Sequence, residues 1–406
     1  MRKFLKQRTM KRVFLSLLTA LFFLPSVWAV DMQAHMGTDE AQEAYDAYLA
    51  NQEAYYTGDF APEVLRALSG NDLFGVLNTL MGITSRIGNS SYSYNSLRDS
   101  YVNVDKDLNN SGCIIGYYDG CKLNGAWDSG TTWNREHTWP QSKGADKKTP
   151  MGHDMQSVRP ASTAVNSERG NVAYGDPANG RYYDPDEVAI NNTLYVPTNL
   201  GSYRGDCARV ILYDYIVYGE AGGHKNNLYS GNAQLLSKLG TSGVFESIPV
   251  LLKWHMNDPV SLTEMVRNDG AEKYQGNRNP FIDYPELAIQ MLKDAGGVST
   301  YDVTVAGAAM WPAYELTLSD GFIAYLGTPD ARPENVTVEG ANFTYDKTNG
   351  RLIVSKVTDD VTVNVLPTGL EDVQWDKTQS IKLLRGGQVY ILRGGRKYNT
   401  MGQRVE

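Results

Sequence analysis

The hydrophobic pattern of this 406-residue chain changes once, near Gly296-Gly297. Before that point apolar residues recur at helical spacing. After it they alternate with polar residues, as in Asp302–Val305 and Val361–Val365. This change predicts an α+β chain, with a mixed helical domain first and a small all-β, sandwich-like domain after it. The predicted segments are residues 1–29, 30–296, 297–368 and 369–406.

The first 29 residues have the pattern of a secretory signal peptide. Six Lys or Arg and no acid precede the apolar run Val13–Leu24, and the small-residue site Val27–Ala29 follows. The run is shorter than the roughly 20 residues that a membrane span needs, so an uncleaved anchor is the less favoured alternative. No later apolar run is long enough to span a bilayer. We therefore expect a secreted, periplasmic or cell-surface protein with no stable membrane span.

Local patterns predict several helices and one long loop. Residues 92–130 are rich in Asn, Asp, Gly and Ser, which favours a loop or a loop with strands. Ser261 and Glu264 form a capping box. The expected helices are Asp39–Ala50, Pro62–Leu68, Asp72–Met81, Cys207–Tyr218, Val244–His255, Ser261–Asn268 and one that starts at Pro285.

The three cysteines are too few for a disulfide scaffold. Cys113 and Cys121 lie eight residues apart and could close a small bridge after export, a question that the sequence leaves open. Cys207 is then left over, and we expect it to be a buried thiol.

The charge of the chain is unevenly distributed. The formal net charge of −8 becomes −14 once the six positive charges of the leader are removed. So acidic a protein is a poor electrostatic match for nucleic acid as a whole. The segment Thr131–Asn171, however, holds six Lys or Arg and four acids, and this locally positive segment is where we look for anion chemistry.

That segment contains the densest group of reactive side chains, Arg135-Glu136-His137. Phosphodiester hydrolysis needs a base for the attacking water, and a neutral imidazole is suited to that task. It also needs a hard divalent cation on oxygen ligands. Glu136 and an amide such as Asn166 supply hard oxygens with one negative charge, which favours Mg²⁺, with Ca²⁺ or Mn²⁺ as alternatives.

Arginines near this group and the geometry of a strand bear on whether it can form one site. Arg135, Arg159 and Arg169 are candidates to contact the phosphates. Because consecutive strand residues point to opposite faces, Glu136 and His137 can serve one site only if the strand bends or the metal lies at its edge.

The stretch Asn134–Ser142 resembles the core motif of the bacterial endonuclease I family, which are secreted or periplasmic nucleases of the His-Me finger (ββα-metal) class. Further motifs follow in the same order, and the resemblance covers roughly residues 45–295. They are Asp154–Pro160, Val165–Asn171, Arg204–Arg209, Leu251–His255, Asp258–Ser261 and Gln275–Leu287.

This resemblance implies roles for individual residues. His137 would be the general base, while Glu136 and Asn166 would hold a single catalytic metal, with Asn166 at the start of the finger's helix. The implied activity is cleavage of DNA, and often RNA, with little sequence preference and with 5′-phosphate ends. The implied partner is nucleic acid, and no obligate protein partner is indicated.

Two departures from the family pattern affect the expected chemistry. Gln156 stands where many members have a His, and Gln141–Gly152 contains Lys but none of the Arg that some members place there. The sequence therefore leaves open which cationic side chain stabilises the transition state. The alternative function is a weak or inactive binding or adhesion protein on a nuclease scaffold.

For several other conspicuous residues we favour a structural role over a functional one. Trp133 and Trp139 are expected to pack around the motif, with base stacking as the alternative. His255 is expected to be structural, and Arg278 to fix a turn through backbone carbonyls. The tail Gly369–Glu406 resembles sorting tails of secreted Bacteroidetes-type proteins, or is a terminal strand pair with a Leu-Arg-Gly-Gly repeat at 384 and 392.

Overall fold

The computed structural model divides the chain into two compact units, with the boundary between Val365 and Leu366. The predicted signal peptide lies outside the described residues. Within the described part, no helix has the length and apolar character that crossing a membrane requires. The structure describes residues 39–87, 91–108, 112–118, 120, 122–176, 182–186, 202–218, 243–327, 332–366, 380–385, 388–393, 396–399 and 404–405.

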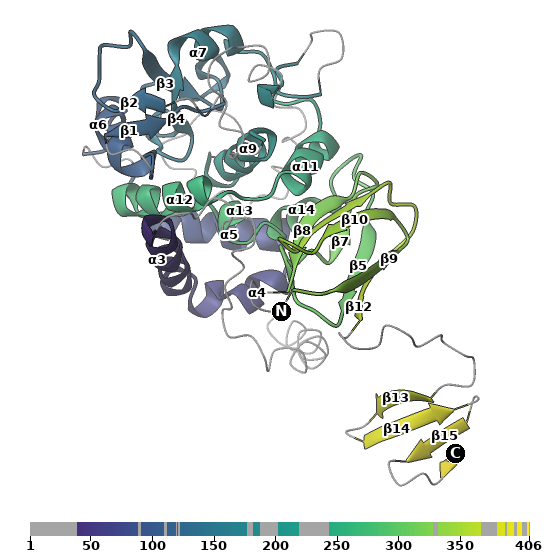
Figure 1. Ribbon diagram of the computed structural model, residues 1–406. Coiled ribbons are helices and arrows are strands. Elements are labelled where there is room, and N and C mark those ends of the chain that lie inside the picture. Colours follow the sequence, from purple (N-terminus) through teal and green to yellow (C-terminus); the bar gives the residue numbers. More distant parts are fainter. Residues whose placement is uncertain are drawn as a thin grey trace, which may run out of the picture. The chain divides into compact units, whose positions relative to one another are not determined.

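The first unit begins with the helices that the sequence predicts (Figure 1). They are α3 (Asp39–Tyr55), the short 3-10 helix η2 (Gly58–Phe60), α4 (Pro62–Arg66) and α5 (Gly70–Thr84). Pro62 occupies the first turn of α4, where its missing N–H costs nothing. In α5 the buried Leu73, Leu77 and Leu80 recur at helical spacing and turn one stripe to the core.

The expected loop over residues 92–130 is partly wrong, because it contains the helix α6 (Tyr94–Val104). Ser93 caps this helix in a reciprocal capping box with Ser96, which satisfies two otherwise unpaired N–H groups. Its buried face consists of Leu97, Tyr101 and Val104, so a helical stripe is present within a mainly polar segment. The antiparallel pair β1 (Cys113–Ile115) and β2 (Lys122–Asn124) follows.

A strand–strand–helix unit comes next. Strands β3 (Trp133–His137) and β4 (Val158–Ser162) pair antiparallel, with Glu136 opposite Arg159. Between the strands lie two short 3-10 helices, η3 (Gln141–Lys143) and η4 (Met151–His153). Helix α7 (Thr163–Arg169) starts directly after β4, because the Ser162 hydroxyl accepts a hydrogen bond from the Val165 N–H at 3.4 Å and caps it.

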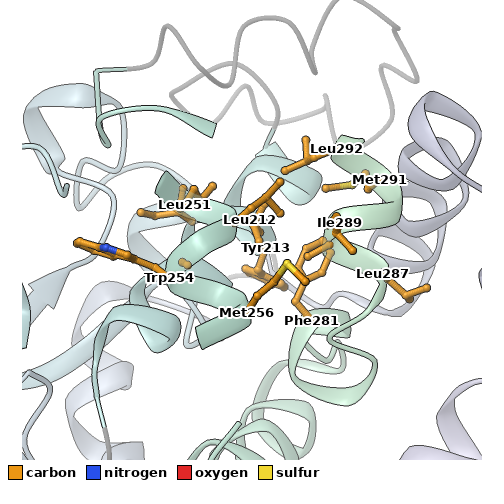
Figure 2. Packing of buried hydrophobic residues seen from close by; sticks show 14 of the residues in the cluster. Leu212, Tyr213, Leu251, Trp254, Met256, Phe281, Leu287, Ile289, Met291 and Leu292 are labelled. Carbon is orange, nitrogen blue, oxygen red and sulfur yellow. The ribbon is translucent and has the colours of Figure 1, made fainter. Parts of the chain in front are cut away.

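The helices behind this unit are α9 (Arg204–Tyr218), α11 (Ile248–Asn257), α12 (Leu262–Gln275), α13 (Pro280–Asp283) and α14 (Leu287–Leu292). Every residue of α9 after Arg204 is buried, so this helix lies in the middle of the core. Figure 2 shows side chains of α9, α11, α13 and α14, among them Leu212 and Met256, gathered between these helices.

Three predicted helix boundaries are corrected. Helix α11 starts at Ile248 rather than Val244, because Ser247 caps it and a proline occupies its first turn. The capping box at Ser261 is confirmed, but α12 continues past Asn268 until Gly276 ends it in the left-handed conformation. Pro280, rather than Pro285, stands in the first turn of a helix.

The predicted β-region contains two four-stranded sheets, in the orders β10-β11-β8-β6 and β7-β5-β12-β9. Strands β12 and β5 run parallel, and the buried Val354 and Leu212 belong to the same hydrophobic cluster. The pattern change near Gly296-Gly297 therefore marks a change of secondary structure within one continuous core. The strands are β5 (Tyr301–Ala306), β6 (Met310–Trp311), β7 (Leu316–Thr317), β8 (Phe322–Leu326), β9 (Asn335–Glu339), β10 (Asn342–Asp346), β11 (Arg351–Ser355) and β12 (Val361–Leu366).

The second unit contains a four-stranded antiparallel sheet in sequential order. The strands are β13 (Ser380–Arg385), β14 (Gln388–Arg393), β15 (Arg396–Asn399) and β16 (Arg404–Val405). The short strands expected from the Leu-Arg-Gly-Gly repeat are confirmed, while the glycine pairs between them lie outside the described residues.

The cysteines are partly described. Cys207 is buried, as predicted, and its sulfur accepts a hydrogen bond from the Tyr117 hydroxyl at 3.3 Å. Cys113 is half-buried and forms no disulfide with any described residue. Cys121 lies outside the described residues, so the bridge between Cys113 and Cys121 stays a prediction.

Candidate active site

A pocket of about 560 Å³ lies where β3 ends and α7 packs on it. It collects side chains from α6, β3, the segment after Pro140 and α7. Because β3 ends at His137, the pocket is lined by both Glu136 and His137, although consecutive strand residues normally face apart. Its lining residues are Tyr94, Asn134, Arg135, Glu136, His137, Pro140, Gln141, Ser142, Asn166, Arg169, Gly170 and Asn171.

Glu136 is the acid of this pocket, and its carboxylate is held from behind. Its Oε1 accepts a hydrogen bond from the Tyr118 hydroxyl at 2.8 Å and forms an ion pair with Arg169 at 3.3 Å. Burial raises the pKa of Glu136, while Arg169 and Tyr118 oppose that shift. Both of these contacts use Oε1, and the backbone of His137 makes a further hydrogen bond to the carboxylate.

The His137 imidazole is buried, and neither ring nitrogen has a hydrogen-bond partner among the described residues. Burial lowers its pKa to about 4, with Arg135 and Arg169 acting in the same direction and the backbone of Ala145 opposing them. The ring stacks on Tyr94, with 5.4 Å between the centroids. The imidazole is therefore neutral near pH 7, and the one ring nitrogen that carries no proton can accept one.

Asn166 lies in the fourth position of α7 and faces the same pocket. Its Nδ2 donates to Oδ1 of Asn134 at 2.5 Å. This hydrogen bond connects α7 to β3 and fixes which way the amide points. The structure thus brings Glu136, His137 and Asn166 to one pocket, as the sequence predicted.

Two of the three predicted phosphate-binding arginines also line the pocket. Arg135 Nη1 donates to the Tyr94 carbonyl at 2.6 Å, and its guanidinium lies 3.7 Å from the Tyr94 ring centroid. Arg169 is buried and donates to the carbonyls of His137 at 3.2 Å and Thr138 at 2.8 Å. Arg169 therefore fixes the end of β3 as well as the Glu136 carboxylate.

The structure does not bring Arg159 to this pocket. Arg159 is buried in a second, smaller pocket, with Asp105 and Asp206 each 3.9 Å away and the Tyr117 ring centroid 4.3 Å away. The same two acids also pair with other arginines, Asp105 with Arg267 at 2.7 Å and Asp206 with Arg209 at 3.2 Å.

Gln156, one of the two departures from the family pattern, also has a structural role. Gln156 is buried and its Nε2 donates to Asn268 Oδ1 at 2.7 Å. The neighbouring Asp154 accepts hydrogen bonds from the hydroxyls of Tyr213 and Tyr218. Both residues therefore connect the hairpin to the helices behind it and do not line the pocket.

The structural interpretations of the other residues hold, with one correction. Trp133 and Trp139 are buried and donate to backbone carbonyls, and His255 contacts the Pro285 carbonyl at 2.8 Å. Arg278 was expected to hold a turn through backbone carbonyls, but all three of its nitrogens donate to carboxylates. It is a buried ion-pair centre.

Three pocket contacts were not predicted from the sequence. Tyr94 comes from the segment read as a loop, 43 positions before His137. Tyr118 donates a hydrogen bond to Glu136, and Asn134 accepts one from Asn166. Of these two supporting residues, only Asn134 belongs to the motif Asn134–Ser142. The tyrosine-rich composition of residues 92–118 suggests a segment that either lines a substrate channel or covers a core, but it does not single out Tyr94 or Tyr118.

Comparison with known proteins gives the class of the protein. The model of the Endonuclease I family matches residues 78–286. The chain belongs to this family. It is therefore a nuclease, whose substrate is nucleic acid and whose reaction is hydrolysis of phosphodiester bonds.

Two curated relatives extend the comparison. The extracellular ribonuclease of Bacillus subtilis (strain 168) is 31% identical over 253 residues, which are 59% of this chain and 78% of that protein. The extracellular ribonuclease of Bacillus amyloliquefaciens is 31% identical over 252 residues, with the same two coverages. The matched family segment contains every residue that lines the pocket.

Proposed function

We propose that this chain is a secreted, metal-dependent endonuclease that cleaves DNA and RNA with little sequence preference and leaves 5′-phosphate ends. The observation that carries the proposal is that Glu136, His137 and Asn166 line one pocket together with two arginines. The two relatives are named as extracellular ribonucleases, which supports both export and activity on RNA.

The donor set of the pocket fits a hard divalent cation. Among the described residues, no group of three or more His, Cys, Asp or Glu side chains could hold a metal ion, so an all-protein cage is not the arrangement. The Glu136 carboxylate and the amide oxygen of Asn166 would instead hold Mg²⁺ with open positions, and Ca²⁺ or Mn²⁺ are possible substitutes. When bound, Mg²⁺ stabilises charge on the phosphate and on the leaving 3′-oxygen.

The side chains of the chain itself supply the remaining chemistry. His137 is neutral near pH 7 and takes a proton from the attacking water through a free ring nitrogen. Arg135 lies in the same pocket and balances charge on the phosphate. Arg169 positions the other residues, since it pairs with the Glu136 carboxylate and donates a hydrogen bond to the His137 carbonyl.

Cleavage assays on plasmid DNA and on RNA test this proposal, with wild type and Glu136→Ala, each with Mg²⁺ and with EDTA. We expect wild type to nick both substrates with Mg²⁺ only, and Glu136→Ala to lose activity. Nicking that survives EDTA would overturn the metal mechanism.

The alternative of a binding or adhesion protein has its own outcome. If purified wild type cleaves neither substrate with any divalent metal but residues 297–368 bind a ligand, that function is favoured instead.

A further inference from the structure

A continuous series of stacked rings and guanidinium groups leads away from the pocket. It starts at His137 and Tyr94 and continues through Arg135, which lies 3.7 Å from the Tyr94 ring centroid and 5.1 Å from that of Trp127. Arg98 lies 5.5 Å from the same Trp127 centroid. Three chain segments, α6, β3 and the turn around Trp127, thus place two arginines on one indole.

Trp127 is fixed from the core side. Its ring packs edge-on against the buried Trp133, with 4.9 Å between the centroids. A guanidinium near an indole gains cation–π attraction and loses conformational freedom. Arg98 and Arg135 both lie within cation–π distance of one anchored ring.

The charges of both arginines remain available. Among the described residues Arg135 has no carboxylate within ion-pair distance, and its buried Nε has no hydrogen-bond partner. Arg98 pairs only through Nε with Asp99 at 3.3 Å, and the Asp99 side chain is 68% exposed. An exposed pair of this kind is weak, so a phosphate can compete for the guanidinium.

The other acid near Trp127 is directed into its own turn. The Asp128 carboxylate accepts hydrogen bonds from the N–H groups of Thr131 and Thr132, each at 2.9 Å, and from the Thr132 hydroxyl at 2.7 Å. These bonds lower the pKa of Asp128 and hold its charge in the turn.

We propose that Arg98 and Trp127 form a second nucleic-acid subsite, in which Arg98 binds a phosphate next to the one held by Arg135. The ligand class is a single strand of DNA or RNA longer than the two nucleotides at the scissile bond. The proposal rests on the proposed function, because it extends the same pocket along the substrate. It assigns substrate contact to α6, a helix outside the motifs of the sequence.

Binding measured without cleavage separates this proposal from the nuclease mechanism. Fluorescence anisotropy in EDTA gives the Kd of a labelled 12-nucleotide single strand and of a trinucleotide, and a gel checks that both stay intact. The variants are Arg98→Gln and Trp127→Leu. Lys347→Gln is the matched control, since it removes one positive charge from a 63% exposed side chain in the turn between β10 and β11.

We expect Arg98→Gln to weaken binding of the 12-mer about 3- to 10-fold at low salt and to reduce the slope of log Kd against log salt by about 0.7. Trinucleotide binding should not change. Trp127→Leu should weaken 12-mer binding similarly, and the double variant should lose little more, because the ring acts by holding Arg98.

Equal 12-mer affinities for Arg98→Gln and Lys347→Gln would overturn the subsite, as would an equal loss for both oligonucleotides. Arg98 lies on the surface of α6, so its variant tests the subsite even if Trp127→Leu does not fold. Loss of 12-mer binding in a protein that never cleaves would leave the subsite standing and reject the nuclease mechanism. If the protein cleaves nucleic acid but Arg98→Gln leaves 12-mer binding unchanged, the nuclease mechanism stands and the subsite is rejected.

Discussion

The pocket and the helical scaffold behind it use arginine and acid in opposite ways. In the scaffold, all three nitrogens of Arg278 donate to carboxylates, and those of Arg209 donate to Glu264, Asp206 and the Asp258 carbonyl. In the pocket, both nitrogens of His137 and the Nε atoms of Arg135 and Arg169 are buried without a partner, and outside it a few such atoms also occur, among them Arg159 Nε and Asp214 Oδ1.

Groups that combine free hydrogen-bonding capacity with a place in the open pocket are the candidates for chemistry. A buried polar group without a partner is costly, so folded proteins rarely keep one without a use. Fully paired arginines fix helices to each other, whereas partly paired ones around an open pocket are available to a substrate. Each of the following predictions tests one side of this contrast.

The largest effect is expected at His137. His137→Ala should lower the cleavage rate by roughly 10² to 10⁴, because the attacking water loses its base. The measurement is the initial rate of plasmid nicking at saturating Mg²⁺. His153→Ala is the control, since this His lies outside the pocket with its ring near the Lys147 carbonyl. A wild-type rate for His137→Ala would reject the assignment of the base.

The scaffold should respond in stability instead of rate. Arg278→Ala leaves Asp283 and Asp269 buried without their cation, which should cost about 3–5 kcal/mol of the free energy of unfolding. Urea unfolding measures this change, and nicking below the transition measures the rate per folded molecule, which should stay near wild type. A selective loss of rate in a stably folded variant would place Arg278 in the chemistry.

A smaller effect is expected at Asn134. Asn134→Ala removes the hydrogen bond that orients Asn166, so the Mg²⁺ concentration for half-maximal rate should rise about 10- to 100-fold. The rate at saturating Mg²⁺ should change less. Asn342→Ala, at an exposed position of β10, is the control. An unchanged Mg²⁺ dependence would mean that Asn166 needs no such support.

The smallest effect is expected from pH between 7.5 and 5.5. Burial lowers the pKa of His137 to about 4, so the imidazole stays neutral over this range and the base remains available. The rate should fall only as the pH approaches 4, where the ring gains its proton. The test is the pH profile of kcat/KM, and a midpoint near 6.5 would contradict the buried, neutral base.

Glu136 can set an acid limit too, because burial raises the pKa of its carboxyl group, in the opposite direction to the shift of His137. The two cases separate with metal concentration. Protonation of Glu136 competes with Mg²⁺, so added Mg²⁺ would move that limit to lower pH. A limit set by His137 should stay in place.

The helices that the sequence predicted well carry their signals locally. Pro62 in a first turn and the Ser261–Glu264 box act within one helical turn, so no distant contact is needed to recognise them. Helix α6 was missed because its stripe of Leu97, Tyr101 and Val104 is embedded among Asn, Ser and Asp. Its helical form depends on burial of that stripe, which is a tertiary effect.

The candidate site shows the same division. The motif pointed to Glu136 and His137, the family resemblance pointed to Asn166, and all three line one pocket. Neither could show that Arg159, directly opposite Glu136 in the β-ladder, forms ion pairs with Asp105 and Asp206. Nor could they show Tyr94 on the ring of His137, since that contact joins segments that only the fold brings together.

The succession of helical and β regions, the caps and the reactive triplet can be recognised in the sequence, because they depend on neighbours within a few residues. The arginines that face the pocket and the tyrosines that contact Glu136 and His137 are known only from the folded chain. Burial and pairing of charge depend on the surroundings of a side chain in space, and residues far apart in the chain supply those surroundings.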